Sequence, residues 1–243
     1  MKQADRELVR FRLVADFYQF VDRPLHVEIL HDLPLLYVRK EPLEDVINRI
    51  IKRTFDIAVS FLVIVFILSW MVPLLGLLIK LESKGPIIFV QLRSGKDNRP
   101  FRCYKFRSMG ANNTTEATQA TKNDLRVTRI GRILRKTSLD EFPQFLNVLI
   151  GNMSVVGPRP HMLKHTEEFS TLTDDYMIRQ FLKPGITGWA QVNGFRGEIK
   201  ELAHIKKRVE HDLWYLENWS LWLDLRIIFL TVYNAVKGEE NAY

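Results

Sequence analysis

The longest uninterrupted apolar stretch covers residues 57–79 and contains no charged side chain, reading IAVSFLVIVFILSWMVPLLGLLI. A helix of this length can cross the hydrocarbon core of a bilayer, which is about 30 Å thick. Pro73 lies well inside the stretch and removes a backbone donor, so we expect the helix to break or kink there. Basic residues flank both ends of the stretch, namely Arg49, Lys52, Arg53, Lys80, Lys84 and Arg93. The positive-inside rule places such flanks on the cytoplasmic side, which favours a helix that turns at Pro73 and returns over a helix that crosses. A buried core helix is the alternative.

The first 42 residues follow other patterns. Apolar positions within residues 8–20 share one face of a helix. Residues 26–30 alternate like a strand, and residues 35–38 form a second short apolar run. Such a short piece is not expected to be stable by itself, so we interpret residues 1–42 as a cover on the main body or the remainder of a longer domain.

The middle of the chain predicts a hairpin and further helices. Residues 86–90 and 101–105 are strand-like, and the polar turn 95–100 separates them. Residues 111–123 are rich in Thr and Asn and predict a surface loop. Residues 161–182 predict helical structure.

Apolar positions between residues 142 and 149 have the spacing of one helix face. Asp140 and Glu141 would then lie in the first turn, where the helix dipole favours negative charge. Ser138 and Glu141 have the spacing of a capping box, so an ordinary helix start explains the carboxylates without any chemistry. A chemical role must be argued from the surroundings.

Composition adds a positive charge to this picture. The chain has 243 residues, a hydrophobic share of 47% and a formal net charge of +7, so one large or two small domains and anionic partners are expected. The first residues are charged throughout, and we expect no cleavable signal peptide. Cys103 is the only cysteine, which excludes an intrachain disulfide and argues against a cysteine-based metal site. We expect Cys103 to be a small buried hydrophobic residue.

Positive charge concentrates between residues 93 and 136, and this segment ends beside Asp140 and Glu141. Four arginines within it recur at every third position, namely Arg126, Arg129, Arg132 and Arg135. A solvated basic face is the usual interpretation of such a run. A positive field beside two carboxylates also suits a polyphosphate substrate with a metal ion between the like-charged groups.

Three further stretches remain open to two interpretations each. Two glycines and two prolines within residues 151–160 present Arg159 from a rigid turn, suited to bidentate phosphate binding or simply structural. Glycines punctuate residues 184–194, which could lie near a ligand or only form turns. Aromatic residues of the C-terminal part suit either a membrane interface or the core. They are Trp214, Tyr215, Trp219, Trp222 and Tyr233.

Taken together and in order, these motifs resemble one family, the bacterial sugar transferases, which are monotopic polyprenol-phosphate phosphoglycosyl transferases. The matching segments are 52–56, the apolar run with Pro73, 85–86, 105–109, 137–144, 157–160, 184–191 and 219–224. The resemblance implies an α-rich α/β fold, with a re-entrant helix-break-helix in residues 43–84. A catalytic domain with a short β-hairpin and interfacial amphipathic helices would occupy residues 85–243. Residues 1–42 resemble the tail of a Rossmann-like domain. Val72 stands before Pro73 where family members often have serine, which puts the break itself in doubt.

The resemblance also implies an activity at the cytoplasmic face of the bacterial inner membrane. Family members transfer a sugar 1-phosphate from a nucleotide sugar, here expected to be a UDP-sugar, to polyprenol (undecaprenyl) phosphate. UMP is released, in the first membrane step of exopolysaccharide, capsule or O-antigen synthesis. The sugar is expected to be a hexose such as glucose or galactose, with an N-acetylated sugar as the alternative.

Residue roles follow from the same resemblance. Asp140 matches the nucleophilic aspartate and Glu141 its partner carboxylate, and the two would hold the Mg²⁺ cofactor. The basic residues matched to phosphate binding are Lys105, Arg107, Arg135 and Arg159. Expected partners are the nucleotide sugar, polyprenol phosphate and membrane lipids, without nucleic acid; a homodimer is compatible with the resemblance. A cationic membrane-anchored nucleic-acid-binding protein or a silent scaffold would explain the charge. Neither would explain the carboxylates at its end.

Overall fold

The computed structural model describes residues 26–31, 33–37, 39–110, 124–195, 197 and 202–237. The chain divides into two compact units, residues 1–40 and 41–243. In the first unit, β1 (His26–Leu30) pairs antiparallel with β2 (Leu33–Tyr37), so the strand predicted at residues 26–30 is confirmed, and β2 overlaps the second apolar run. The helix predicted within residues 8–20 and the loop predicted at 111–123 lie outside the described residues.

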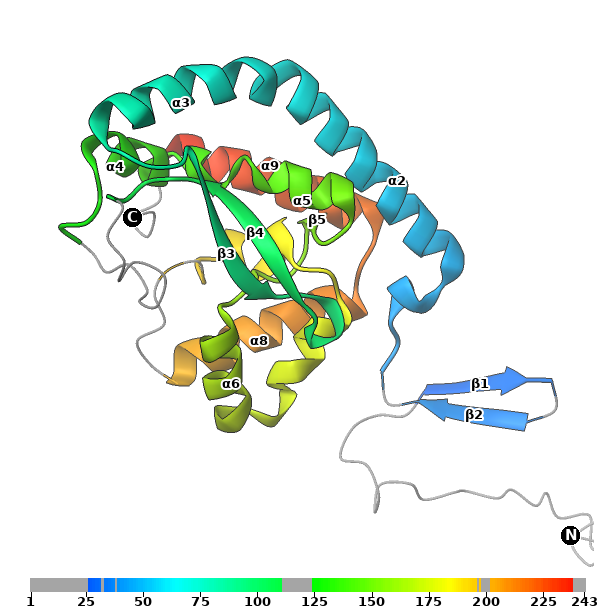
Figure 1. Ribbon diagram of the computed structural model, residues 1–243. Coiled ribbons are helices and arrows are strands. Elements are labelled where there is room, and N and C mark those ends of the chain that lie inside the picture. The colour runs from blue at the N-terminus through cyan, green and yellow to red at the C-terminus, as the bar shows by residue number, and fades with distance from the viewer. Residues whose placement is uncertain are drawn as a thin grey trace, which may run out of the picture. The chain divides into compact units, whose positions relative to one another are not determined.

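The second unit is rich in helices and contains two small sheets (Figure 1). Its longer helices are α2 (Val46–Val63), α3 (Ser69–Glu82), α6 (Leu163–Leu172), α8 (Leu202–Glu217) and α9 (Leu221–Lys237). Its shorter helices are α4 (Arg129–Lys136), α5 (Gln144–Ile150) and α7 (Trp189–Val192), with 3-10 turns at Pro42–Glu44, Lys96–Asn98, Leu139–Glu141 and Asp174–Phe181. Its strands are β3 (Ile88–Ser94), β4 (Pro100–Phe106), β5 (Ser154–Val156) and β6 (Gly185–Thr187).

The apolar run lies in one continuous helix that arches over the unit (Figure 1). The side chain of Asp45 caps its start by accepting hydrogen bonds from the backbone N–H groups of Ile47 and Asn48. A π-helical turn, Ile64–Leu68, joins α2 to α3. The arch is therefore a single helix with one widened turn.

Pro73 does not break this helix, which differs from the expectation. Pro73 lies inside α3, and the backbone irregularity comes earlier, at Ile64–Leu68. Two side chains satisfy carbonyls of that widened turn: Ser69 Oγ donates to Val65 O at 2.6 Å, and Trp70 Nε1 donates to Phe66 O at 2.8 Å. Because a π-helical turn already adjusts the hydrogen-bond ladder upstream of the proline, the helix can curve through it without ending.

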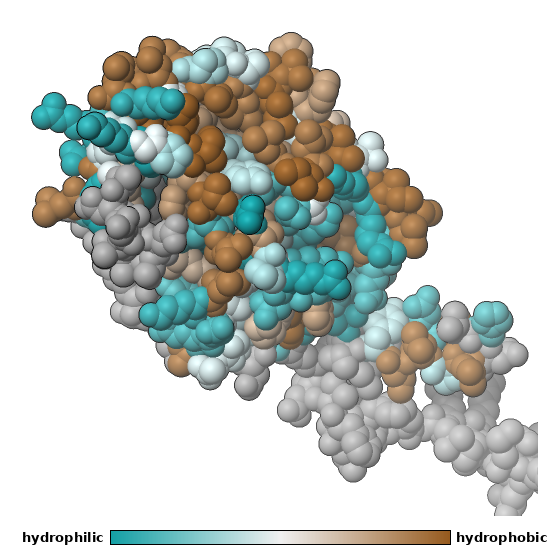
Figure 2. Space-filling view, viewed as in Figure 1, coloured by the Kyte–Doolittle hydropathy of each residue, from teal (hydrophilic) through white to brown (hydrophobic). Residues whose placement is uncertain are grey.

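Most apolar side chains of the arch face outward. Only 22% of its most apolar 18-residue window is buried, which argues against the interpretation as a core helix. Figure 2 shows hydrophobic side chains gathered over this edge of the unit, and residues such as Phe66, Trp70 and Leu77 are exposed. A long apolar helix with an uncovered face is compatible with a monotopic membrane protein.

The predicted hairpin is confirmed, with β3 and β4 antiparallel and Gln91 opposite Cys103. Cys103 is 1% exposed, in agreement with the expectation of a small buried residue. The main core joins β4, α5, the parallel pair β5–β6 and helices α8 and α9. Within the C-terminal aromatics, Tyr215 and Trp219 pack in this core, which confirms the core interpretation for these two residues, while Trp222 is 77% exposed. A role of Trp222 at a membrane interface stays a prediction.

A buried ion pair fixes the start of the arch to the core. Lys52 Nζ lies 2.7 Å from the carboxylate of Asp224 in α9, and it also donates to Tyr215 Oη at 3.0 Å and Val156 O at 3.1 Å. The next residue, Arg53, donates to the carbonyl of Val148 at 2.6 Å. Residues 52–56 and 219–224, singled out in the sequence, thus hold the helix against β5, α5 and α9.

Candidate active site

Asp140 and Glu141 lie in the 3-10 turn Leu139–Glu141, between α4 and α5. Ser138 before them has a left-handed backbone with φ 58°, and its side chain does not cap the turn. The Glu141 N–H donates instead to the Ser138 carbonyl at 3.2 Å. The capping-box interpretation is therefore wrong, and the Glu141 carboxylate is available for other partners.

Pro143 separates the carboxylates from the helix they were expected to start. It is the N-cap of α5, so both carboxylates precede that helix. The buried side of α5 also differs from the predicted apolar face, because Leu146 is exposed and Asn147 is buried. The Asn147 side chain accepts from Tyr104 N at 3.0 Å and donates to Arg102 O at 2.7 Å. This pairing anchors α5, and with it the acidic turn, along β4.

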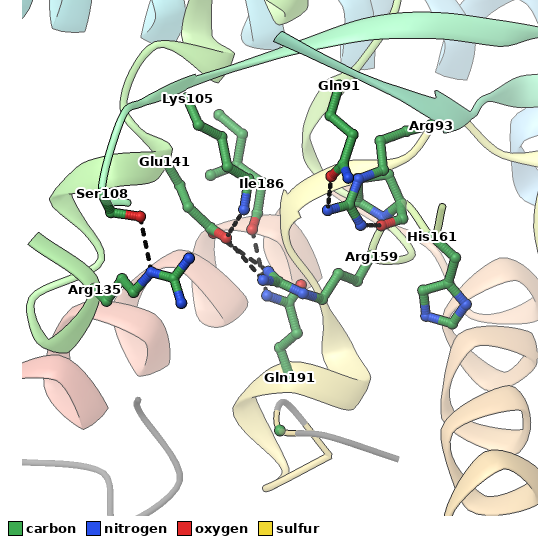
Figure 3. A network of polar contacts seen from close by, with 12 residues as sticks. Gln91, Arg93, Lys105, Ser108, Arg135, Glu141, Arg159, His161, Ile186 and Gln191 are labelled. Carbon is green, nitrogen blue, oxygen red and sulfur yellow. Dashed lines mark hydrogen bonds and ion pairs between the residues drawn. The ribbon is translucent and has the colours of Figure 1, made fainter. Parts of the chain in front are cut away.

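Two cations from distant elements converge on Glu141 (Figure 3). Lys105 in β4 places Nζ 2.7 Å from Glu141 Oε1. The guanidinium of Arg159, from the turn after β5, lies 2.7 Å from Oε1 and 3.3 Å from Oε2. Both cations are partly exposed while Glu141 is buried, so their remaining N–H donors can meet a ligand from the open side.

Asp140 differs from its neighbour in having no such partner. Its side chain is buried at 8% exposure, and no residue in the described part of the chain forms a hydrogen bond or ion pair with its carboxylate. Burial raises the pKa of Asp140, Lys105 opposes this shift, and the adjacent Glu141 charge adds to it. Asp140 is thus a carboxylate beside three cations, Lys105, Arg135 and Arg159. Neither of its oxygens has a hydrogen-bond or ion-pair partner among the described residues.

Arg135 approaches this site from the end of α4. Its Nε donates to Ser108 Oγ at 2.8 Å, and its charge acts on Asp140. Arg129 and Arg132 on the same helix are exposed, as expected for a solvated basic face. Arg126 precedes the helix and pairs with Asp124 at 2.6 Å. Only the last arginine of the series therefore reaches the carboxylates.

Arg107 was grouped with the phosphate-binding residues, and the structure places it elsewhere. Its guanidinium donates to the carbonyls of Lys84 at 2.8 Å and Ser83 at 2.7 Å, just past the end of α3. Those carbonyls lack partners within the helix, and a cation satisfies them well. Arg107 thus fixes the end of the arch. Its terminal guanidinium N–H groups are bound to the carbonyls that follow α3, so they do not point to the carboxylates.

Two glycine-containing segments interlock to hold Arg159. Gly157 N donates to Thr187 O and Gly185 N donates to Pro158 O, both at 2.9 Å. A Cβ atom on Gly185 would lie 2.1 Å from Gly157 N, so this close backbone approach requires glycine. Residues 184–191 therefore lie against the Arg159 turn and stiffen it.

A buried network behind the turn was missed in the sequence. Arg179 donates to the Arg159 carbonyl at 2.9 Å and pairs with Asp212 at 2.9 Å. The ring of His161 lies 2.6 Å from Tyr176 Oη, and burial together with Arg179 and other arginines lowers its pKa well below its usual range. No motif marks these residues, because they meet only through the packing of α8 on the 3-10 turn Asp174–Phe181.

The fit of the expected metal can be judged from the carboxylates. Within the described ranges there is no group of three His, Cys, Asp or Glu side chains suited to a metal ion. Mg²⁺ does not need one, since proteins commonly hold it through one or two carboxylates together with substrate phosphates. The uncommitted carboxylate of Asp140, next to Glu141, is compatible with that mode of binding.

Comparison with known proteins shows the family of the chain. Residues 47–238 match the family described as bacterial sugar transferase. The UDP-glucose:undecaprenyl-phosphate glucose-1-phosphate transferase of Escherichia coli (strain K12) is 47% identical over 224 residues, which are 92% of this chain and 48% of that protein. A protein of the same name from Xanthomonas campestris pv. campestris is 41% identical over 245 residues, covering 100% and 50% of the two chains. One from Caulobacter vibrioides is 41% identical over 203 residues, covering 83% and 75%. The chain thus spans about half the length of the first two relatives.

Proposed function

Because the chain belongs to the bacterial sugar transferase family, we propose that it transfers a sugar 1-phosphate from a UDP-sugar to polyprenol phosphate. The observation that carries this proposal is the state of Asp140: a buried carboxylate without a partner among the described residues, beside Lys105, Arg135 and Arg159. The names of the relatives favour UDP-glucose and undecaprenyl phosphate as the substrates.

In the first step, a carboxylate oxygen of Asp140 attacks the β-phosphorus of the nucleotide sugar. A bond forms between this oxygen and phosphorus, and the bond from phosphorus to the oxygen bridging the two phosphates breaks. UMP leaves with that oxygen and its electron pair. The sugar phosphate stays on Asp140, so one difficult transfer becomes two easier ones.

In the second step, a phosphate oxygen of the polyprenol phosphate attacks the same phosphorus. The bond between phosphorus and Asp140 breaks, which restores the carboxylate and yields polyprenol diphosphate sugar. Because Lys105 and Arg159 lie beside both carboxylates, we expect them to stay close to the charged phosphoryl oxygens in both steps. Donors held in place before the reaction stabilise the transition state without a cost of reorganisation.

The role of Glu141 in this reaction is to orient the two cations Lys105 and Arg159. Its carboxylate holds Lys105 and Arg159 together, each at 2.7 Å, where their free N–H groups can meet the diphosphate. Asp140 and Glu141, with the diphosphate oxygens, would hold Mg²⁺, which when bound neutralises substrate charge. Activity that is lost on chelation and restored by added magnesium would support this assignment.

The arch supports a location of this chemistry at a membrane. Its outward apolar side chains suit contact with lipid, and the basic flanks favour the cytoplasmic face. We therefore place the protein on the cytoplasmic side of the bacterial inner membrane, where it would meet the head group of a polyprenol phosphate.

The two-step route predicts a burst of product. Detergent-solubilised protein incubated with Mg²⁺ and UDP-glucose, without any polyprenol phosphate, should release about one UMP per active site. Mass spectrometry should then find a hexose phosphate on the peptide that contains Asp140. Release of UMP only when both substrates are present, without an adduct, would contradict the covalent route. Absence of UMP release under every condition, with other UDP-sugars also tested, would favour a scaffold or a nucleic-acid-binding protein.

A further inference from the structure

Gln191 in α7 is a buried polar side chain to which the reaction above gives no role. It is 6% exposed, and Figure 3 shows its carboxamide pointing toward the Arg159–Glu141 pair. Its Nε2 donates to Ile186 O in a long hydrogen bond of 3.4 Å. Its Oε1 is buried and has no hydrogen-bond partner in the part of the chain that the structure describes.

The orientation of this carboxamide follows from its neighbour. The Ile186 carbonyl only accepts hydrogen bonds, so the NH₂ group of Gln191 must face it. Rotating the amide by half a turn would bring two oxygens together and would lose the hydrogen bond to Ile186. Oε1 therefore points away from Ile186 as a buried acceptor, and it destabilises the fold while it lacks a donor.

The helix that carries Gln191 begins close to the turn that carries Arg159. A Cβ atom on Gly188 would lie 3.5 Å from Gln191 Oε1 and 2.2 Å from the Gly157 carbonyl, so the start of α7 is pressed against the turn that carries Arg159. The Val192 N–H donates to Gly188 O at 3.1 Å and closes the first turn of α7. Figure 3 shows the Gln191 side chain beside Arg159, at the edge of the candidate active site.

We propose that Gln191 is a substrate-binding residue whose carboxamide oxygen accepts a hydrogen bond from a hydroxyl of the transferred sugar. The inference rests on the proposed function. Arg159 and Glu141 mark the place of the β-phosphate, and the sugar is bonded directly to that phosphate whereas uridine lies one phosphate further away. Sugar hydroxyls are therefore the donors nearest to Gln191. A buried acceptor of this kind also selects for sugars that carry the hydroxyl, because an analogue without it leaves the oxygen unpaired.

The test uses Gln191→Met in the full chain, with Gln180→Met as the matched control. Gln180 is also a buried glutamine with an unpaired Oε1, but it lies on the 3-10 turn Asp174–Phe181. With UDP-glucose, Gln191→Met should raise KM about tenfold, the loss expected for one hydrogen bond, while the control changes it little. The melting temperature of Gln191→Met should stay equal or rise, since methionine removes an unsatisfied buried acceptor. A fall in melting temperature without a change in KM would show a purely structural residue and overturn the proposal.

A second arm locates the contact on the substrate. Inhibition by UDP, which lacks the sugar, should be equally strong against the wild type and Gln191→Met. Equal weakening of UDP and UDP-glucose would place the contact on the nucleoside diphosphate and overturn the assignment to the sugar. Wild-type protein that releases no UMP from any UDP-sugar would refute the proposed function itself, whereas active wild type with an unchanged Gln191→Met refutes only this inference.

Discussion

Asp140 and Glu141 are adjacent in sequence and both are buried, but they differ in their partners. Glu141 is held by two cations, and Asp140 is buried beside them with both oxygens uncommitted. The sequence predicted that both acids matter, but the local spacing favoured a capping box. The partners of Glu141 lie 36 and 18 positions away along the chain, so local spacing could not reveal which carboxylate is engaged. That assignment required the folded geometry.

Replacement of Asp140 by Asn should abolish activity without loss of stability. Loss of the proposed nucleophile should lower UMP release on the order of a thousandfold or more. The pKa of Asp140 is raised in the folded state, so the folded state binds its proton more tightly. Wild-type stability therefore falls as pH rises from the ordinary aspartate pKa through this raised value. Asn does not ionise, so the variant should equal or exceed the wild type in thermal unfolding at pH 7.

Glu141→Gln provides the contrast to that substitution. It removes a charge that Lys105 and Arg159 share, and it should lower the free energy of unfolding by about 1–3 kcal/mol, given the partial exposure of both cations. An Asp140→Asn variant that keeps its activity, or is destabilised as strongly as Glu141→Gln, would return Asp140 to a structural role.

Among helices and strands, those with a long periodic pattern of apolar residues could be predicted from the sequence, and the shortest ones could not. The hairpin was predicted to within a few residues because β3 and β4 are long enough for their spacing and their polar turn to be visible. The parallel pair β5–β6 was missed because each strand has three residues, too few for a period. Its register depends on backbone contacts between Gly157 and Gly185. Sequence suggested rigid turns there but not that they pair with each other.

The helix α2 offers a test of how the arch is held. Lys52→Met should destabilise the protein by about 3–5 kcal/mol, because it leaves the buried carboxylate of Asp224 without its cation. Arg49→Met is the matched control, since Arg49 is an exposed basic residue one turn earlier on the same helix. Thermal or denaturant unfolding of both variants in the same detergent would measure the difference. Equal stability of the two would mean that the ion pair contributes nothing net to folding.

At the scale of the second unit, both ends of the arch are tied to the same core. Near its start Lys52 binds Asp224, and at its end Arg107 binds the carbonyls of Ser83 and Lys84. The carboxylate of Glu82 also accepts from Arg129 N at 2.6 Å, at the start of α4. The helix is 37 residues long, about 55 Å if straight, so it could span a bilayer by length alone. Because both ends are attached to the same unit, we expect the helix not to cross the bilayer while that unit is intact.

The sequence also predicted that both ends of the apolar helix lie on the same side of the membrane, but from charge and not from contacts. The basic flanks of residues 57–79 predicted two ends on one side, through the positive-inside rule. The expected cause, a break at Pro73, was wrong in position because hydrogen bonds from Ser69 and Trp70 side chains support a π-helical turn upstream. Side-chain donors to backbone carbonyls of this kind cannot be read from hydropathy.

This arrangement predicts that both flanks of the arch face the cytoplasm. Single cysteines replacing Glu44 and Lys96, both exposed, would be labelled with a membrane-impermeant maleimide in a Cys103→Ala background. Inverted inner-membrane vesicles should label both positions, and spheroplasts should label neither. Cysteine at Leu74, an exposed position beside Pro73, should react only after detergent is added, because lipid covers it in the intact membrane. Labelling of one flank in spheroplasts and the other in inverted vesicles would show a crossing helix. The contacts of Lys52 and Arg107 could not then both exist in the membrane, and the geometry derived for Asp140 and its cations would have to be rebuilt from a different packing of the core.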